Sequence, residues 1–333
     1  MPSHVQFRTL IEDRPGEQWR ALFDRFWPGY RAWFLRGAPG AGYLDSRRAL
    51  RKHMPELVPT WEALVELAGG GDTEARFLSS WCPPPYIRGC AQAVWLDAAG
   101  SDEPALLRNY DYAPGLLEGN WLATRWCGQR VVALGDCMWG ALDGLNESGL
   151  AASLSFGGRT EHGEGFGVPI ALRYLLETAE TTAQAVQLLQ RLPISMSYSI
   201  TLLDRRSEWA TVFVAPDRAA EVTKHLAVTN FQHRVEWPAH ANSTRATLRL
   251  ERLREVAGGA VSAELIAEAL LQPPLFQTGY ERGWGTLYTA LYRPTSGRVE
   301  LRWPQHRWQQ SIAQFAPGTH SAHYADEASE SAT

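Results

Sequence analysis

The sequence predicts an α+β protein built as a layered sandwich, with a helical segment at its N-terminus. Apolar residues recur at spacings of three and four over residues 16–37 and 46–70, and Gly runs follow each segment, so residues 1–80 are predicted to be helical. From residue 91 onward most apolar runs are short and bounded by turn residues, as in strands. Strands, then a helical pair, then strands again favour packed layers.

The first predicted strands follow the helix-breaking segment PPPYIRGC (83–90). Residues 91–100 and 103–114 are expected to form a hairpin with Cys90 at its head, and a second pair is expected at 130–136 and 149–156, joined by the turn DGLNESG. Beyond it we expect two helices within 167–193, strands at 197–204, 208–216 and 225–231, a helix at 243–257, and last strands at 286–294 and 298–303. The tail 316–333 is small, polar and acidic, so disorder is expected there.

The composition is that of an ordinary soluble globular protein. Of 333 residues, 45% are hydrophobic and 20% charged, with a net charge of -4, so no nucleic-acid surface is predicted. The N-terminus has no signal-peptide core and no window approaches the roughly 20 apolar residues of a membrane span, so we expect a cytoplasmic protein without a membrane partner. The four cysteines show no zinc-site spacing, and neither a metal nor an organic cofactor is expected.

Candidate catalytic residues surround Cys90, which follows Gly89. Arg108 and Asp111 stand 18 and 21 residues further on, where the returning strand of the hairpin would bring them beside Cys90. Because the two are an odd number of residues apart, they cannot face the same side of a regular strand. A bulge or the end of the strand could resolve this, and the sequence leaves the choice open.

Four sequence anchors resemble one known family. They are Cys90 itself, LLRNYDYAP (106–114) with an RNxD pattern, DGLNESGL (143–150) with an NExGL turn, and LAVTNF (226–231) with a TN pair. Together they resemble the N-terminal-nucleophile linear amide hydrolases, which include choloylglycine hydrolases, penicillin V acylase, acid ceramidase-like amidases and the acyl-coenzyme A:6-aminopenicillanic acid acyltransferases. The resemblance covers about residues 85–300. It is closer to the acyltransferase branch, because a long segment precedes Cys90.

The resemblance implies a four-layer αββα sandwich and a self-processing enzyme. Residues 1–89 would be a helical pro-segment retained as a small subunit, and 90–315 the catalytic domain. Cutting the bond between Gly89 and Cys90 would give the cysteine a free α-amine, which titrates near pH 7.7 to 8 and can act as its general base. The implied activity is hydrolysis of a linear amide, or acyl transfer from it, through a Cys90 thioester.

The resemblance also implies roles for individual residues. Asp111 would orient the new α-amine, and Arg108 would lie against the sulfur or Asp111, although both could instead form a structural ion pair. Asn230 would donate its amide N–H to the oxyanion, unless it only forms a turn. A backbone N–H of Ser155 or Phe156 would be the second oxyanion donor.

An arginine after a serine or threonine completes the charge network in the family. Arg245 fits, because Thr244 precedes it, and Arg249 and Arg252 are the alternatives on the same predicted helix. Ala91 departs from the family pattern, which often has threonine after the nucleophile, so a hydroxyl often found beside the cysteine is missing here.

Two other functions are compatible with the sequence. One is an unprocessed papain-like thiol hydrolase that uses a histidine such as His162 or His233. The other is a tryptophan-rich binding protein. The expected partner is a small-molecule amide or acyl substrate, and water, an amine or acyl-coenzyme A would complete the reaction. An aromatic or fatty acyl group would suit the tryptophans expected to flank the pocket. These are Trp95, Trp121, Trp126 and Trp139.

Overall fold

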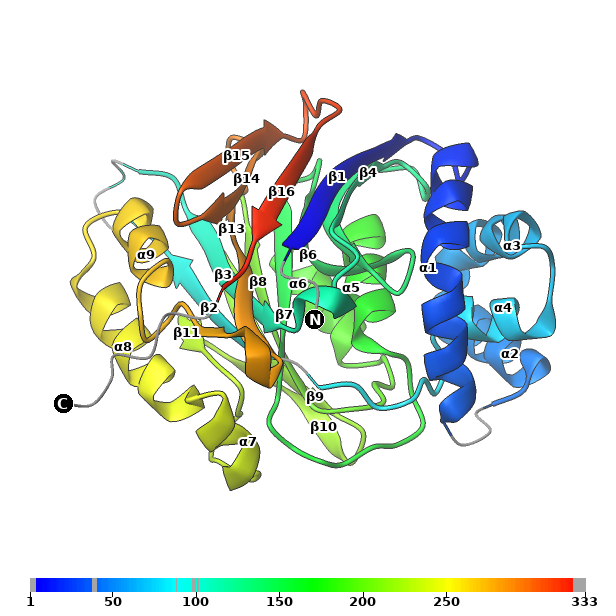
Figure 1. The fold of residues 1–333 in the computed structure, drawn as a ribbon, viewed down its shortest axis with the longest axis horizontal. Coiled ribbons are helices and arrows are strands. Elements are labelled where there is room, and N and C mark those ends of the chain that lie inside the picture. The colour runs from blue at the N-terminus through cyan, green and yellow to red at the C-terminus, as the bar shows by residue number, and fades with distance from the viewer. Residues whose placement is uncertain (1–3, 38–40, 88, 98–99, 101, 326–333) are drawn as a thin grey trace.

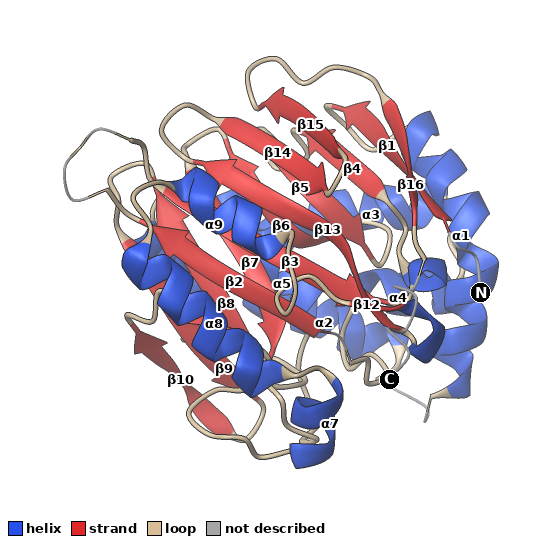
Figure 2. Ribbon diagram, turned by 60° about the vertical axis from the view of Figure 1, so that its left-hand side comes forward, coloured by secondary structure: helices blue, strands red, loops and turns tan. Residues whose placement is uncertain are grey.

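Two β-sheets packed face to face form the centre of the molecule, with helices on both outer faces (Figures 1 and 2). The structure is a computed structural model, which describes residues 4–37, 41–87, 89–97, 100 and 102–325. The arrangement is a four-layer αββα sandwich, as the sequence predicts.

The larger sheet has nine strands within the described residues. Its neighbours pair antiparallel except for β1 and β4, which are parallel. In spatial order the strands are β10 (Arg218–Thr223), β9 (Trp209–Ala215), β8 (Tyr198–Asp204), β7 (Leu150–Phe156), β6 (Gly140–Asn146), β5 (Val131–Asp136), β4 (Asn120–Thr124), β1 (His4–Glu12) and β16 (Thr319–His323).

The smaller sheet carries the predicted hairpin with Cys90 near its head. Cys90 lies opposite Tyr110, and Gln92 lies opposite Arg108. The strands are β11 (Ala227–Val228), β2 (Gly89–Trp95), β3 (Ala105–Tyr112), β13 (Trp284–Arg293), β14 (Arg298–Trp303) and β15 (His306–Ser311), with β12 (Thr278–Gly279) paired to β13. The nucleophile candidate therefore lies one strand from the sheet edge, which the short β11 covers.

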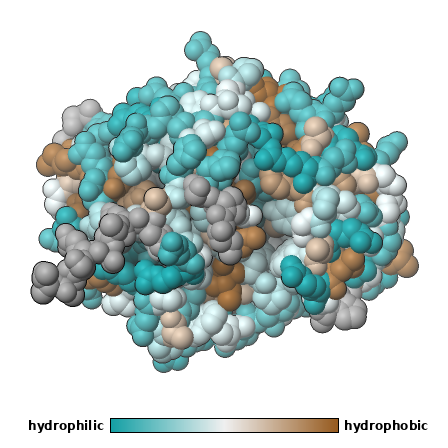
Figure 3. All heavy atoms as spheres, in the orientation of Figure 1, coloured by the Kyte–Doolittle hydropathy of each residue, from teal (hydrophilic) through white to brown (hydrophobic). Residues whose placement is uncertain are grey.

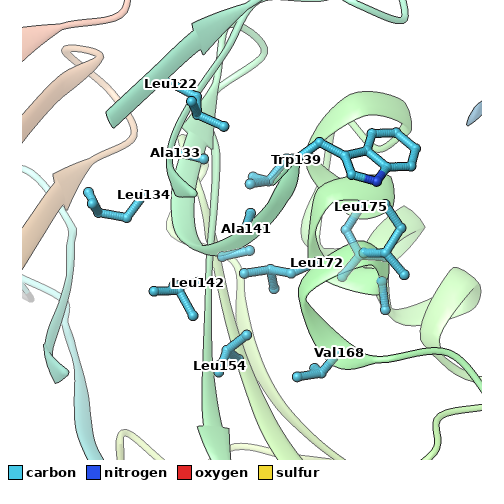
Figure 4. Packing of buried hydrophobic residues seen from close by; sticks show 14 of the residues in the cluster. Leu122, Ala133, Leu134, Trp139, Ala141, Leu142, Leu154, Val168, Leu172 and Leu175 are labelled. Atoms are coloured by element: carbon cyan, nitrogen blue, oxygen red, sulfur yellow. The ribbon is translucent and has the colours of Figure 1, made fainter. Parts of the chain in front are cut away.

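Helices cover the outer face of each sheet because they bury one apolar side there. Leu172 and Leu175 lie beside Ala141 of the larger sheet and beside Trp139, in the turn that leads into β6 (Figure 4). The helices on this face are α5 (Val168–Thr178) and α6 (Thr182–Leu189), and those on the smaller sheet are α7 (Pro238–Ser243), α8 (Ala246–Gly259) and α9 (Ala263–Leu270).

The N-terminal segment is not wholly helical, which corrects the prediction for residues 1–80. His4–Glu12 form β1, inserted between β4 and β16, and Figure 1 shows the first and last strands side by side. The Glu12 carboxylate then accepts backbone N–H groups of Gly16 and Gln18 where the first helix begins. The helices are α1 (Glu17–Arg36), α2 (Tyr43–His53), α3 (Val58–Leu67) and α4 (Asp72–Ser79), and 3₁₀ turns occur at Pro55–Leu57, Pro114–Leu116 and Tyr280–Arg282.

Three further predictions are wrong. The helix expected at 46–70 is interrupted at Pro55. The segment between the second pair of strands is itself the strand β6, and the turn is only NESG. Residues 316–325 are ordered and include β16, whereas the rest of the expected acidic tail, 326–333, lies outside the described residues.

The face in Figure 3 is mainly hydrophilic, with small separate hydrophobic areas. In the part of the chain that the structure describes, no helix has both the length and the apolar character to cross a membrane. The same part contains no group of three or more His, Cys, Asp or Glu side chains that could hold a metal ion.

The C-terminal strand should contribute to stability. Tyr324 is 6% exposed, donates its hydroxyl to the Leu287 carbonyl at 2.7 Å, and packs on the Tyr280 ring. We expect Tyr324→Ala to lower the free energy of unfolding by about 2–4 kcal/mol. In the same urea titration, Val261→Ala, at a position 79% exposed, should change it by less than about 0.5 kcal/mol. Equal midpoints for the two variants would contradict this role.

Candidate active site

Cys90 points into the space between the two sheets. Alternation along β2 puts Cys90 and Val94 in the core shared by the sheets, whereas Ala91 and Ala93 pack against α8 and α9. Cys90 is fully buried. Its sulfur therefore lies in a water-poor environment, where a neighbouring charge acts strongly.

Arg108 supplies that charge. Its Nη2 donates to Cys90 Sγ at 2.8 Å, and its Nη1 donates to Asp143 Oδ2 at 2.7 Å and to the Leu142 carbonyl at 2.8 Å. Burial lowers the pKa of Arg108, but Cys90, Tyr288 and Asp143 more than offset this and leave the pKa above its ordinary value. The guanidinium therefore holds a fixed positive charge next to the Cys90 sulfur.

Asp143 is a site residue that the sequence analysis missed. Tyr288 donates its hydroxyl to Asp143 Oδ2 at 2.6 Å, and Tyr292 donates to Oδ1. Burial, and next the Asp143 charge, hold the pKa values of both tyrosines well above their ordinary range, so they remain donors. The signal was available: a carboxylate in a strand must find partners if it is buried. DGLNESGL was instead interpreted as a turn.

Asp111 lies on the opposite face of β3 from Arg108, which resolves their odd spacing without a bulge in β3 itself. Arg249 Nη1 donates to Asp111 Oδ2 at 2.5 Å, Thr286 Oγ1 donates to Oδ1 at 2.8 Å, and Gln277 Nε2 approaches Oδ2 at 3.3 Å. The register shift occurs in β13, near Thr286. Asp111 and Arg108 thus belong to two separate networks rather than to one ion pair.

Arg249, not Arg245, joins the charge network, and the prediction for Arg245 is corrected. Arg245 is exposed at the N-cap of α8, in a left-handed conformation with φ 52°. Arg249, one turn further, is fully buried and meets Asp111. Arg252 is exposed and pairs with Glu255. The preceding residue Thr244, which favoured Arg245, therefore did not identify the arginine that is buried.

Asn230 connects the two networks. Its Oδ1 accepts the Cys90 backbone N–H at 3.0 Å and Arg249 Nη2 at 2.7 Å. Its Nδ2 lies 3.2 Å from Ser155 Oγ and 3.4 Å from the Phe156 carbonyl, where it donates. Asn230 is therefore next to the Cys90 nitrogen, and its amide donor faces the end of β7.

Gly89 packs closely against Asp111. A Cβ added there would lie 3.1 Å from Asp111 Cβ and 3.4 Å from Asp111 Oδ2. The backbone of Gly89 is not left-handed, so close packing rather than backbone conformation favours glycine here.

Two asparagines in the quoted motifs have structural bonds. Asn109 Nδ2 donates to the Leu270 carbonyl at 2.7 Å. Asn146 Nδ2 donates to the Leu176 and Ala179 carbonyls at the end of α5. The NExGL segment therefore ties a hairpin to a helix.

The histidines and tryptophans singled out from the sequence occupy other positions. His162 Nε2 is 3.1 Å from the Pro83 carbonyl, and His233 pairs with Glu221 at an exposed position. The four tryptophans expected at the pocket are buried and line none of the cavities described below.

Comparison with known proteins gives a family match. The model of the family "Acyl-coenzyme A:6-aminopenicillanic acid acyl-transferase" matches residues 98–308, which begin after Cys90. Comparison with the curated proteins gave no match.

Solved structures with a similar fold include a mutant of conjugated bile acid hydrolase from Clostridium perfringens. It has a TM-score of 0.50 and 9% identity, and the match covers 73% of this chain and 100% of the other, which confirms the layered sandwich fold. Penicillin V acylase from Agrobacterium tumefaciens has a TM-score of 0.48 and 14% identity over 67% of this chain and 86% of its own. The N-acylethanolamine-hydrolyzing acid amidase ortholog from Caenorhabditis elegans has a TM-score of 0.48 and 17% identity over 69% and 99%.

Replacing the buried arginine should cost far more stability than replacing the exposed one. Arg249→Met leaves the Asp111 carboxylate buried without its cation, so we expect a loss of about 3–5 kcal/mol in the free energy of unfolding. Arg245→Met should stay within about 0.5 kcal/mol of the parent. Adding Asp111→Asn to Arg249→Met should recover part of the loss in the same denaturation assay. No recovery would mean that the loss comes from packing rather than from the uncompensated charge.

Proposed function

Because the chain belongs to the acyl-coenzyme A:6-aminopenicillanic acid acyl-transferase family, we propose that it is a self-processing amidohydrolase or acyltransferase whose nucleophile is Cys90. The observation that carries the proposal is the 2.8 Å contact between Cys90 Sγ and the Arg108 guanidinium. A neighbouring cation stabilises a thiolate, which is the reactive form of cysteine. This chain is homologous to enzymes that hydrolyse amides or transfer acyl groups.

Processing begins with attack of Cys90 Sγ on the carbonyl carbon of Gly89. The C–N bond between the two residues breaks, a thioester forms, and the thiol proton ends on the departing Cys90 nitrogen. Water then hydrolyses the thioester, which leaves a carboxylate on Gly89 and a free α-amine on Cys90. The new carboxylate arises beside the Asp111 side chain, so repulsion between two negative charges favours its departure.

Turnover repeats the same attack on an external amide. The α-amine arises 3.0 Å from Asn230 Oδ1, where the backbone nitrogen already lies, and takes the thiol proton. Asn230 Nδ2 is the proposed oxyanion donor, since its two present bonds are long enough to exchange. The second donor is a backbone N–H of Ser155 or Phe156. Water or an amine then attacks the thioester carbonyl, takes the acyl group and releases the Cys90 sulfur.

The fragment 1–89 should stay bound after cleavage. β1 hydrogen-bonds to β4 on one side and to β16 on the other. Trp19 and Trp61 from its helices are buried, and Trp19 Nε1 donates to the Met138 carbonyl in the larger fragment. The fragment is thus proposed to be a retained small subunit.

Wild-type protein should run under denaturing conditions as pieces of roughly 10 and 27 kDa, in proportion to residues 1–89 and 90–333. Cys90→Ala should remain one folded, inactive chain of 37.1 kDa, because processing and turnover use the same sulfur. Cys127→Ala is the matched control and should still be cleaved. N-terminal sequencing of active protein that detects no chain beginning Cys-Ala-Gln-Ala would falsify self-processing.

Asn230→Ala should lower kcat of the processed enzyme by about 10² to 10³, the cost of losing one oxyanion donor. Asn109→Ala is the control, because it removes a buried asparagine on the neighbouring strand whose bonds are structural. It should lower the melting temperature while kcat at 25 °C changes little. Near-normal kcat with a large loss of stability in Asn230→Ala would make Asn230 a structural residue.

A further inference from the structure

A cavity of about 410 Å³ lies between α1 and the chain that follows Asp111. Its walls come from α1, from the segment before Cys90 and from the chain after β3, and they include Phe26, Tyr30, Trp33, Tyr86, Tyr112 and Glu118. Tyr112 follows Asp111 directly, and its ring is 6.1 Å from that of Tyr110, which lies under the Arg108 guanidinium. One wall of the cavity is therefore linked through two tyrosine rings to the arginine that contacts Cys90.

One wall of this aromatic cavity is acidic. Glu118 is 4% exposed and Asp136 is 1% exposed, and both line the cavity. The Tyr30 hydroxyl joins them, 2.6 Å from Glu118 Oε1 and 3.2 Å from Asp136 Oδ1. Two carboxyl groups beside aromatic rings form an environment that favours a cation, through charge and through the ring faces.

Resting on the proposed function, we propose that the substrate is an amide that carries a basic amine, whose ammonium group binds in this cavity between the aromatic walls and Glu118. The apolar part of the substrate would lie along Phe26 and Trp33, and its amide would extend past Tyr112 toward Cys90. About 410 Å³ is enough for a small arylalkyl or alkyl chain.

The electrostatics of the wall agree with this occupant. Burial, and next the charge of Asp136, raise the pKa of Glu118 to about 7. A bound ammonium group would offset both effects and favour the ionised carboxylate. Arg36 also lines the cavity, but it is exposed and its Nε donates to the Ala32 carbonyl on its own helix, so its charge is solvated at the rim.

Glu118 also has a structural role, which the test must separate from binding. Its Oε1 accepts the Met138 backbone N–H, and its Oε2 accepts Asn120 Nδ2. Gly29 offers an independent variant, because it lines the cavity on α1 and a Cβ added there meets no atom within 4 Å. Gly258 on α8 has the same open surroundings away from the cavity.

The experiment measures binding to Cys90→Ala, the uncleaved chain, by titration calorimetry at pH 8. The probes are phenethylamine, its neutral analogue 2-phenylethanol and the anion phenylacetate. Phenethylamine should bind about tenfold more tightly than either analogue, as one charge contact allows. Glu118→Gln should remove most of this preference, Gly29→Leu should abolish binding, and Gly258→Leu should leave it unchanged.

The inference is overturned if phenethylamine does not bind, if phenylacetate binds better, or if Gly29→Leu binds as the parent does. Because binding needs no turnover, the result is independent of the nucleophile. If the wild-type protein is cleaved after Gly89 but does not prefer the ammonium probe, only the proposed substrate class is wrong. If the protein prefers the ammonium probe but is never cleaved, only the proposed function is wrong.

Discussion

A single buried guanidinium, that of Arg108, sets the geometry on which the site depends. It extends from one sheet to contact the Cys90 sulfur beside it and the Asp143 carboxylate of the opposite sheet. A buried charge is costly unless it is well hydrogen-bonded. Here two tyrosine hydroxyls also donate hydrogen bonds to the Asp143 carboxylate. The sheets cannot slide relative to each other without breaking these bonds. The same hydrogen bonds therefore fix both the position of the Cys90 sulfur and the packing of the two sheets.

The layered fold could be predicted because its evidence is local. Periodicity identified α1 and the pair α5 and α6, and the hairpin of β2 and β3 followed from two apolar runs around a turn. The strand β6 was missed because GALDGLN contains two glycines, an aspartate and an asparagine, which are typical turn residues. Strands β1 and β16 were missed because their partners are distant in sequence: they pair with each other across about 300 residues, and β1 also pairs with β4 across about 100.

The site was only partly predictable for the same reason. Cys90, Arg108 and Asp111 lie in one hairpin, so register alone relates them. Arg249 could not be distinguished from Arg245, because residues four apart share one face of a continuous helix. The difference is that Arg245 is the N-cap, just outside α8, and where a helix begins is poorly defined by sequence. Asp143 comes from the other sheet, and no spacing in the sequence reveals which strands will face each other.

The position of β1 between two strands affects how the protein would lose and recover its folded state. While the chain is intact, unfolding and refolding are unimolecular, and dilution does not affect them. If the bond before Cys90 is cut as proposed, recovery of the fold requires two fragments to meet, so apparent stability depends on concentration. β1 must also release both of its ladders before the fragment can leave. The lifetime of the proposed cleaved form would therefore depend on the rate of that release, and at low concentration released fragments would rarely meet again.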